Sequence, residues 1–108
     1  MAPRRKPRPN PPQAEVPREA LEARTWFISG RVQGVGFRWF VHASANAIGV
    51  RGWVRNEDDG RVQVYGIGNK EQLDRLAAAL YRGPSQAEVR GVEQISAPVQ
   101  QLSSFSVR

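Results

Sequence analysis

The sequence of 108 residues contains no cysteine and a single histidine, His42. The lack of cysteine excludes a disulfide scaffold, a thiolate zinc site, an iron–sulfur cluster and a cysteine nucleophile. One histidine cannot form a metal site that needs several histidine ligands. We therefore expect no bound metal and no other cofactor.

Long apolar runs are also missing. No stretch approaches the roughly 20 apolar residues that cross a bilayer, and no apolar signal segment follows the basic start. These absences predict a cytoplasmic protein that does not associate with membranes. The length and the 40% share of hydrophobic residues suit one small domain with an appendage.

Proline and positive charge are concentrated at the start of the chain. Six of the eight prolines lie in residues 1–17, where no apolar periodicity accompanies them. Half of the net charge of +6 lies in residues 1–24, so the remaining chain is only mildly basic. We predict that residues 1–22 are a disordered tail rich in proline and arginine, and that residues 23–108 form the folded domain. The basic tail predicts weak, salt-dependent contact with nucleic acid and no specific binding.

Apolar periodicity after residue 24 predicts the order β-α-β-β-α-β, followed by a short extra strand. One helical period begins at Phe37 and stops at Gly49, and a second runs from a cap at Asn69 to Gly83. The predicted strands span residues 25–29, 51–56, 61–66, 87–96 and 104–107. This order is typical of the α+β ferredoxin-like sandwich, an antiparallel sheet with two helices on one face, here with a short extra edge strand.

The segment between the first strand and the first helix, Gly30–Arg38, carries three glycines. Glycines let the main chain turn with its N–H groups facing inward, and a helix start adds free N–H donors and a positive dipole end. The combination predicts a site for a small tetrahedral anion, which Arg38 can grip with two hydrogen bonds. A dinucleotide fingerprint would need glycine in place of Trp39, and a P-loop would need lysine after a glycine. The pattern therefore favours a small phosphate compound over a nucleotide.

Gly30–Arg38 and the later segment Gly52–Asn56 together resemble the two signature motifs of the acylphosphatase family. The similarity extends over residues 25–108, through Asp59–Val62 and Phe105–Arg108. It implies hydrolysis of a carboxyl–phosphate anhydride to a carboxylate and inorganic phosphate, without a metal or a covalent intermediate. We expect a monomer that acts on a small acyl phosphate.

The resemblance also implies a role for each residue of the site. Arg38 would bind the phosphoryl group, and Asn56 would orient the attacking water. The main-chain N–H groups around the phosphate oxygens would be those of Gln33, Gly34, Val35, Gly36, Phe37 and Arg38. The residue chemistry agrees independently, because a carboxylate leaving group has a pKa of about 4 to 5 and departs without a general acid. Charge stabilisation and an aligned nucleophile are then the main requirements.

Plainer interpretations compete at three positions. The plainer interpretation of Arg38 is a surface cation paired with Glu57 or Asp58, and that of Asn56 is a turn residue. For His42, the functional interpretation is a general base and the plainer one is a solvated helix residue. The glycine loop and the resemblance favour catalytic roles for Arg38 and Asn56, and a solvated His42. Glu57 departs from the threonine that some family members carry after the asparagine. A carboxylate that faced inward at this position would slow the capture of an anionic substrate.

Two functions from other classes share some of these features. RNA-recognition domains have the same strand order, and Gly34–Phe40 faintly resembles their aromatic motif. Their aromatic residues lie on a strand, whereas Phe37 and Phe40 follow a helical period and are expected in the core. A phosphate-binding interaction domain without turnover is the second alternative. The presence of both Arg38 and Asn56 favours an enzyme.

Overall fold

The computed structural model describes residues 20–108, and residues 1–19, which hold most of the predicted tail, lie outside the described residues. Within the described part, five strands and two helices follow one another in the predicted order. Their bounds are β1 (Glu22–Arg31), α1 (Phe37–Ile48), β2 (Arg51–Asn56), β3 (Val62–Gly68), α2 (Lys70–Arg82), β4 (Glu88–Ala97) and β5 (Phe105–Val107).

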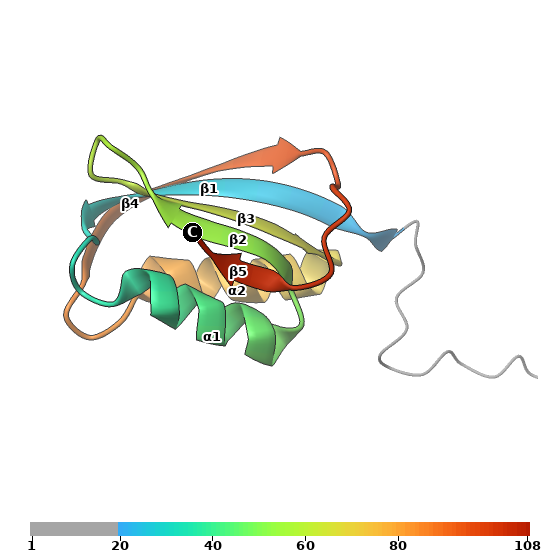
Figure 1. The fold of residues 1–108 in the computed structure, drawn as a ribbon, viewed down its shortest axis with the longest axis horizontal. Helices are drawn as coiled ribbons and strands as arrows, with labels where there is room; N and C mark the ends of the chain where they lie inside the picture. Colours follow the sequence, from blue (N-terminus) through green and yellow to red (C-terminus); the bar gives the residue numbers. More distant parts are fainter. Residues whose placement is uncertain (1–19) are drawn as a thin grey trace, which may run out of the picture.

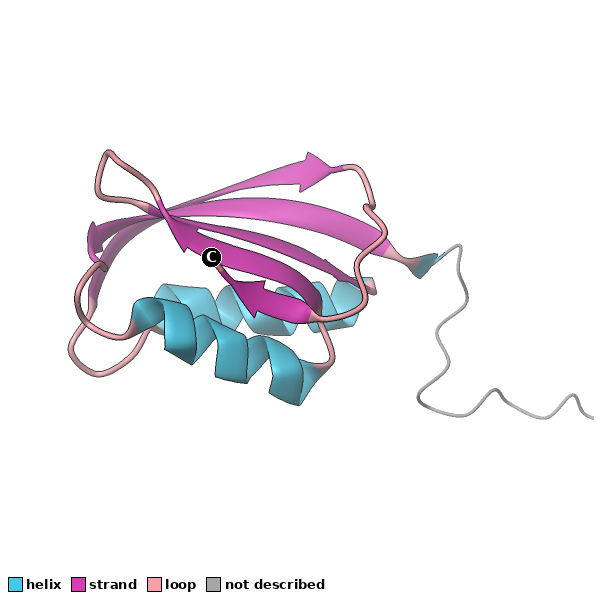
Figure 2. Ribbon diagram, in the orientation of Figure 1, coloured by secondary structure: helices cyan, strands magenta, loops and turns pink. Residues whose placement is uncertain are grey.

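The five strands of residues 20–108 form one sheet in the order β4-β1-β3-β2-β5. Both helices cover the same face of this sheet (Figures 1 and 2), which confirms the predicted ferredoxin-like fold. One part of the prediction is wrong: β5 pairs parallel to β2, so the sheet is mixed rather than wholly antiparallel. The reason is the path of the chain. It leaves β4 at the end of the sheet where β2 starts and crosses to the far edge, so β5 runs in the same direction as β2 (Figure 1).

Strand β1 is longer than the strand predicted for residues 25–29. It begins at Glu22, the last residue of the predicted tail, and continues to Arg31. The extra residues pair through the main chain, for example Glu22 with Gly68 and Arg31 with Glu88, and such pairing needs no apolar side chain. The connection to α1 is therefore only residues 32–36.

The main core lies between the sheet and the two helices. Alternate residues of each strand point into it, as the two-residue period of a strand requires. Its members include Trp26, Ile28, Phe37, Val41, Val54, Val62, Val64, Leu73, Leu76 and Leu80. A smaller cluster of Ala23, Trp53, Tyr65 and Ile67 lies apart from it. Val54 belongs to the main core, so the next residue but one in β2, Asn56, also points to the helix side of the sheet.

Gly52 lies where β2 passes close to the main chain of β3. Its φ of +146° is unfavourable for other residues, and a Cβ atom there would lie 1.8 Å from the carbonyl oxygen of Tyr65. We expect Gly52→Ala to lower the free energy of unfolding by at least about 2 kcal/mol, because the methyl group must force the paired strands apart. Urea denaturation measures the loss. Gly91→Ala in the edge strand β4 is the control, since its methyl would meet only the Ser29 hydroxyl at 3.0 Å, and equal losses would contradict the explanation.

Asp74 on α2 ties this helix to β1. Its carboxylate accepts hydrogen bonds from Lys70 Nζ at 3.0 Å and from Arg24 at 2.9 Å. These two bonds, that of Lys70 first, lower the pKa of Asp74 from its usual 3.8. A lowered folded-state pKa means that the pairing stabilises the protein above pH 3.8 and is lost as the pH falls through the lowered value.

Asp74→Asn therefore has an effect that depends on pH in a defined direction. We expect the variant to unfold at lower urea concentration than the wild type at pH 7, with the difference shrinking below pH 3.8. Asp58→Asn is the control, because Asp58 has no hydrogen bond or ion pair within residues 20–108. A difference of constant size from pH 7 downward would show that Asp74 does not act through its charge.

Candidate active site

The loop of residues 32–36 leads into a helix start without a side-chain cap. Gly36 is the N-cap of α1 with a φ of 79°, no side chain bonds to the first turn, and the first turn has no acidic residue. The first helical hydrogen bond runs from Phe40 N–H to Gly36 O at 3.0 Å, which leaves the earlier N–H groups of α1 without a helical partner. By contrast, α2 has a complete capping box from Asn69 and Gln72. The start of α1 is therefore the helix end with donors free for an anion.

Arg38 lies in the first turn of α1 and reaches toward the strands. Its Nη1 donates to the main-chain oxygen of Arg108 at 2.8 Å. The N–H of Arg108 in turn donates to the carbonyl oxygen of Val54 at 2.8 Å. No ion pair of Arg38 occurs within residues 20–108, so the alternative pairing with Glu57 or Asp58 is absent. Arg38 is connected instead to β2, two residues before Asn56.

Asn56 is the last residue of β2 and pairs across the ladder with Val62. Its side chain is exposed and has no hydrogen-bond partner in the described part of the chain. It therefore lies at the strand end with its amide open to solvent. The turn of residues 57–61 follows it and connects β2 to β3 at the same end of the molecule as the loop before α1 (Figure 1).

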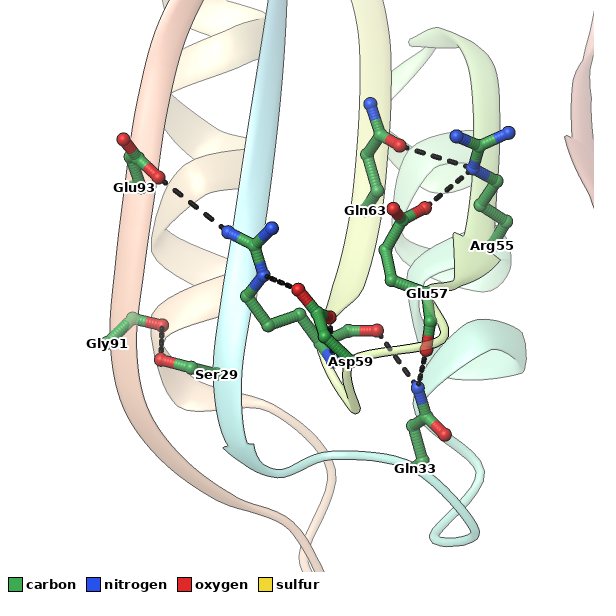
Figure 3. A network of polar contacts seen from close by, with 9 residues as sticks. Ser29, Gln33, Arg55, Glu57, Asp59, Gln63, Gly91 and Glu93 are labelled. Atoms are coloured by element: carbon green, nitrogen blue, oxygen red, sulfur yellow. Dashed lines mark hydrogen bonds and ion pairs between the residues drawn. The ribbon is translucent and has the colours of Figure 1, made fainter.

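The Gln33 side chain joins the loop to this turn. Its amide nitrogen donates to the carbonyl oxygen of Glu57 at 2.8 Å and to that of Arg61 at 3.0 Å (Figure 3). The loop motif predicts only a main-chain contribution from Gln33, so this side-chain contact is an addition to the predicted site. No local signal reveals it, because both acceptors are main-chain atoms more than 20 residues away in sequence.

Glu57 turns its carboxylate away from the loop. Its Oε2 accepts from Arg55 Nε at 2.7 Å, and the same Nε lies 3.2 Å from Oε1 of Gln63 (Figure 3). Arg55 and Gln63 are cross-strand partners and point to the sheet face opposite Val54 and Asn56. The departure from threonine thus does not direct a negative charge at the start of α1.

Comparisons with known proteins show which family contains this chain. The family model for acylphosphatase matches residues 24–107. The chain belongs to the acylphosphatase family. An acylphosphatase of Solibacter usitatus is 48% identical over 87 residues, which is 81% of this chain and 91% of that protein. The predicted family and the predicted enzyme class, a hydrolase of the acylphosphatase type, are confirmed.

Solved acylphosphatase structures share the fold. The acylphosphatase from Coxiella burnetii superposes with a TM-score of 0.80 at 33% identity, over 83% of this chain and 95% of that chain. The acylphosphatase from Bacillus subtilis gives a TM-score of 0.77 at 34% identity, over 82% of this chain and 98% of that chain. The similarity therefore spans the whole domain and not the loop alone.

The hairpin turn that follows Asn56 in this acylphosphatase is held by Asp59. The carboxylate of Asp59 accepts from the main-chain N–H of Arg61 at 3.1 Å and from Arg61 Nε at 2.9 Å. The main-chain hydrogen bond is the largest cause that lowers the pKa of Asp59 from 3.8. The carboxylate is therefore charged, and holds Arg61, through the neutral and mildly acidic range.

His42 lies one turn after Arg38 and packs among side chains. Its ring meets those of Trp39 and Phe105 edge to face, and Nε2 lies 3.3 Å from the Asn46 amide. His42 is therefore half-buried rather than solvated as expected, and its contacts are to neighbouring side chains and not to the loop of residues 32–36.

Two absences within residues 20–108 concern metal ions and membranes. No group of three or more potential ligands could hold a metal ion in this part of the acylphosphatase chain, and none of its helices is long and apolar enough to span a membrane.

Phe37 is buried in the core and Phe40 packs against it, both on α1. The aromatic stretch that resembles an RNA-binding motif is therefore not displayed on a strand for stacking with bases.

Proposed function

We propose that this protein hydrolyses acyl phosphates by in-line attack of a water molecule, without a metal and without a covalent intermediate. The observation that supports this proposal most is a pair of hydrogen-bonded bridges on either side of Asn56. One runs from Arg38 through Arg108 to Val54, and the other from Gln33 to Glu57. They tie the start of α1 and the end of β2 to each other.

The phosphoryl group would be held by the loop and by Arg38. The main-chain N–H groups of residues 33–38 would surround its oxygens, as the uncapped start of α1 supports. Arg38 has five N–H donors and uses one on Arg108, so the guanidinium keeps donors for two phosphate oxygens. Its positive charge would offset the charge on the equatorial oxygens in the transition state.

The Asn56 amide would position the nucleophile. As its oxygen accepts a hydrogen bond from the water, the water oxygen attacks phosphorus and the bond from phosphorus to the acyl oxygen breaks. The carboxylate leaves with the bonding electrons, and the proton of the water passes to a phosphate oxygen. This route needs no base from the protein, which fits the contacts of Glu57 and His42 within residues 20–108: the Glu57 carboxylate bonds to Arg55, and His42 contacts Asn46.

We further propose that the protein acts as a monomer in the cytoplasm, on small acyl phosphates and without specific nucleic-acid binding. Ion pairs within residues 20–108 support the last point, since four of the ten arginines there, Arg24, Arg55, Arg61 and Arg90, lie beside carboxylates. Paired cations release fewer counterions on binding a polyanion.

Hydrolysis of benzoyl phosphate in the presence of a chelator tests the proposed function. We expect turnover that the chelator does not reduce, and competitive inhibition by inorganic phosphate, which occupies the same loop. In water labelled with ¹⁸O, the label should enter phosphate and not benzoate, because the proposed attack is at phosphorus. A folded protein without turnover, or label in benzoate, would contradict the proposal.

A further inference from the structure

We propose that the side chain of Gln33 is a positioning residue that fixes the phosphate-binding loop at a set distance from Asn56, an inference that rests on the proposed function. The main chain of Gln33 belongs to the loop, whereas its side chain leaves the loop and bonds to the turn after β2 (Figure 3). The residue thus spans the two parts that would hold the phosphate and the water.

Both protons of the Gln33 amide are committed to this contact. The acceptors are the carbonyl oxygens of Glu57 at 2.8 Å and Arg61 at 3.0 Å, and only the NH₂ end of an amide can face two carbonyls. The amide oxygen that remains is an acceptor, which would repel a phosphate oxygen. The side chain therefore braces the site rather than binding the substrate.

The two carbonyl groups lie at the base of the hairpin turn, next to Asn56. Glu57 follows Asn56 directly, and the N–H of Glu57 donates to Arg61 O at 2.8 Å. The N–H of Gly60 donates to Glu57 O at 3.1 Å. Each carbonyl thus already has a main-chain donor, and Gln33 adds a second one. Its bonds are not needed to satisfy the turn, so what they add is the fixed position of the loop.

Within the described residues, Gln33 makes the only side-chain hydrogen bonds between loop 32–36 and the turn after β2. The glycines at positions 34 and 36 have no side chain to contribute. Reactions that depend on alignment lose about 10²-fold for a displacement near 1 Å. Loss of the Gln33 contact should therefore affect the rate of the chemical step more than the binding of phosphate.

Gln33→Met tests this inference, because methionine has a similar length and no donor. We expect kcat for benzoyl phosphate to fall by about 10-fold or more, with the inhibition constant of inorganic phosphate changed by less than about 3-fold, since the loop N–H groups remain. Gln63→Met is the matched control: this glutamine also bonds to a group on the hairpin, but on the opposite sheet face, and we expect it to keep its activity.

A double-mutant cycle with Asn56→Ala separates positioning from general destabilisation. If Gln33 acts by aligning Asn56 with the phosphate, Gln33→Met should lower kcat by less than about 2-fold once Asn56 is gone. Equal losses in both backgrounds, an unchanged kcat in the single variant, or a weakened phosphate affinity with an unchanged kcat would each overturn the inference. If Gln33→Met does not fold, Gln33→Asn, whose shorter side chain cannot reach both carbonyls, takes its place in the same cycle.

Failure of the proposed function and failure of the role proposed for Gln33 would give different results. A wild-type protein without turnover would reject the proposed function itself. A wild type that turns over, loses activity with Arg38→Ala and keeps it with Gln33→Met would reject only the role of Gln33.

Discussion

We expect replacement of Arg38 by alanine to lower kcat/KM for benzoyl phosphate by about 10³-fold or more, the loss typical of an arginine that stabilises a transferring phosphoryl group. This equals about 4 kcal/mol of transition-state stabilisation. The effect on folding should be small, because Arg38 makes one side-chain hydrogen bond within residues 20–108, to Arg108 O, and a single such bond contributes about 1 kcal/mol. Steady-state kinetics and urea denaturation of the same sample measure the two effects.

Two further variants assign the cause of the loss. Arg75→Ala removes the same charge from an exposed position on α2 and should leave kcat/KM within a few-fold. Arg38→Lys keeps the charge but not the two-pronged donor, so its activity should lie between that of the wild type and that of Arg38→Ala. If Arg38→Ala retained more than a tenth of wild-type activity, or if Arg75→Ala lost as much, the proposed role of Arg38 would be wrong.

The order of the elements was predictable because each one carries a local pattern. Phe37 and Val41 repeat at helical spacing before Gly49, and Asn69 with Gln72 predicts the cap that the structure contains. The direction of β5 was not predictable from Phe105–Val107, since it depends on where the chain leaves β4. Local sequence determines the type of an element, and the path between elements determines its partners.

The candidate site likewise has features that the sequence predicts and features that it does not. The glycines and Arg38 form a local motif, which can be identified because the donors of a loop and a helix start are consecutive in sequence. The Gln33 contact and the outward direction of Glu57 depend on atoms of other segments: the carbonyl of Arg61 and the guanidinium of Arg55. Such contacts have no sequence pattern, because any residue supplies a carbonyl oxygen.

Asn56→Ala should lower kcat by about 10²-fold or more, as the loss of a positioned hydrogen-bonding group does in other enzymes. The inhibition constant of inorganic phosphate should change little, because the loop and Arg38 stay in place when the Asn56 side chain is removed. Folding should also be little affected, since the side chain is exposed and has no hydrogen-bond partner within residues 20–108. The loss should therefore appear in kcat alone.

Asn46→Ala is the matched control for Asn56. Asn46 is an exposed asparagine on α1 whose amide contacts only His42 among the described residues, and its loss should leave kcat within about 2-fold, as for most surface substitutions. A kcat of Asn56→Ala near that of the wild type would exclude this residue as the group that holds the water. A phosphate inhibition constant that rose in proportion to the loss of kcat would instead place Asn56 among the phosphate ligands. Only a fall in kcat with phosphate affinity retained assigns Asn56 to the nucleophile, because the product binds the loop without the attacking water.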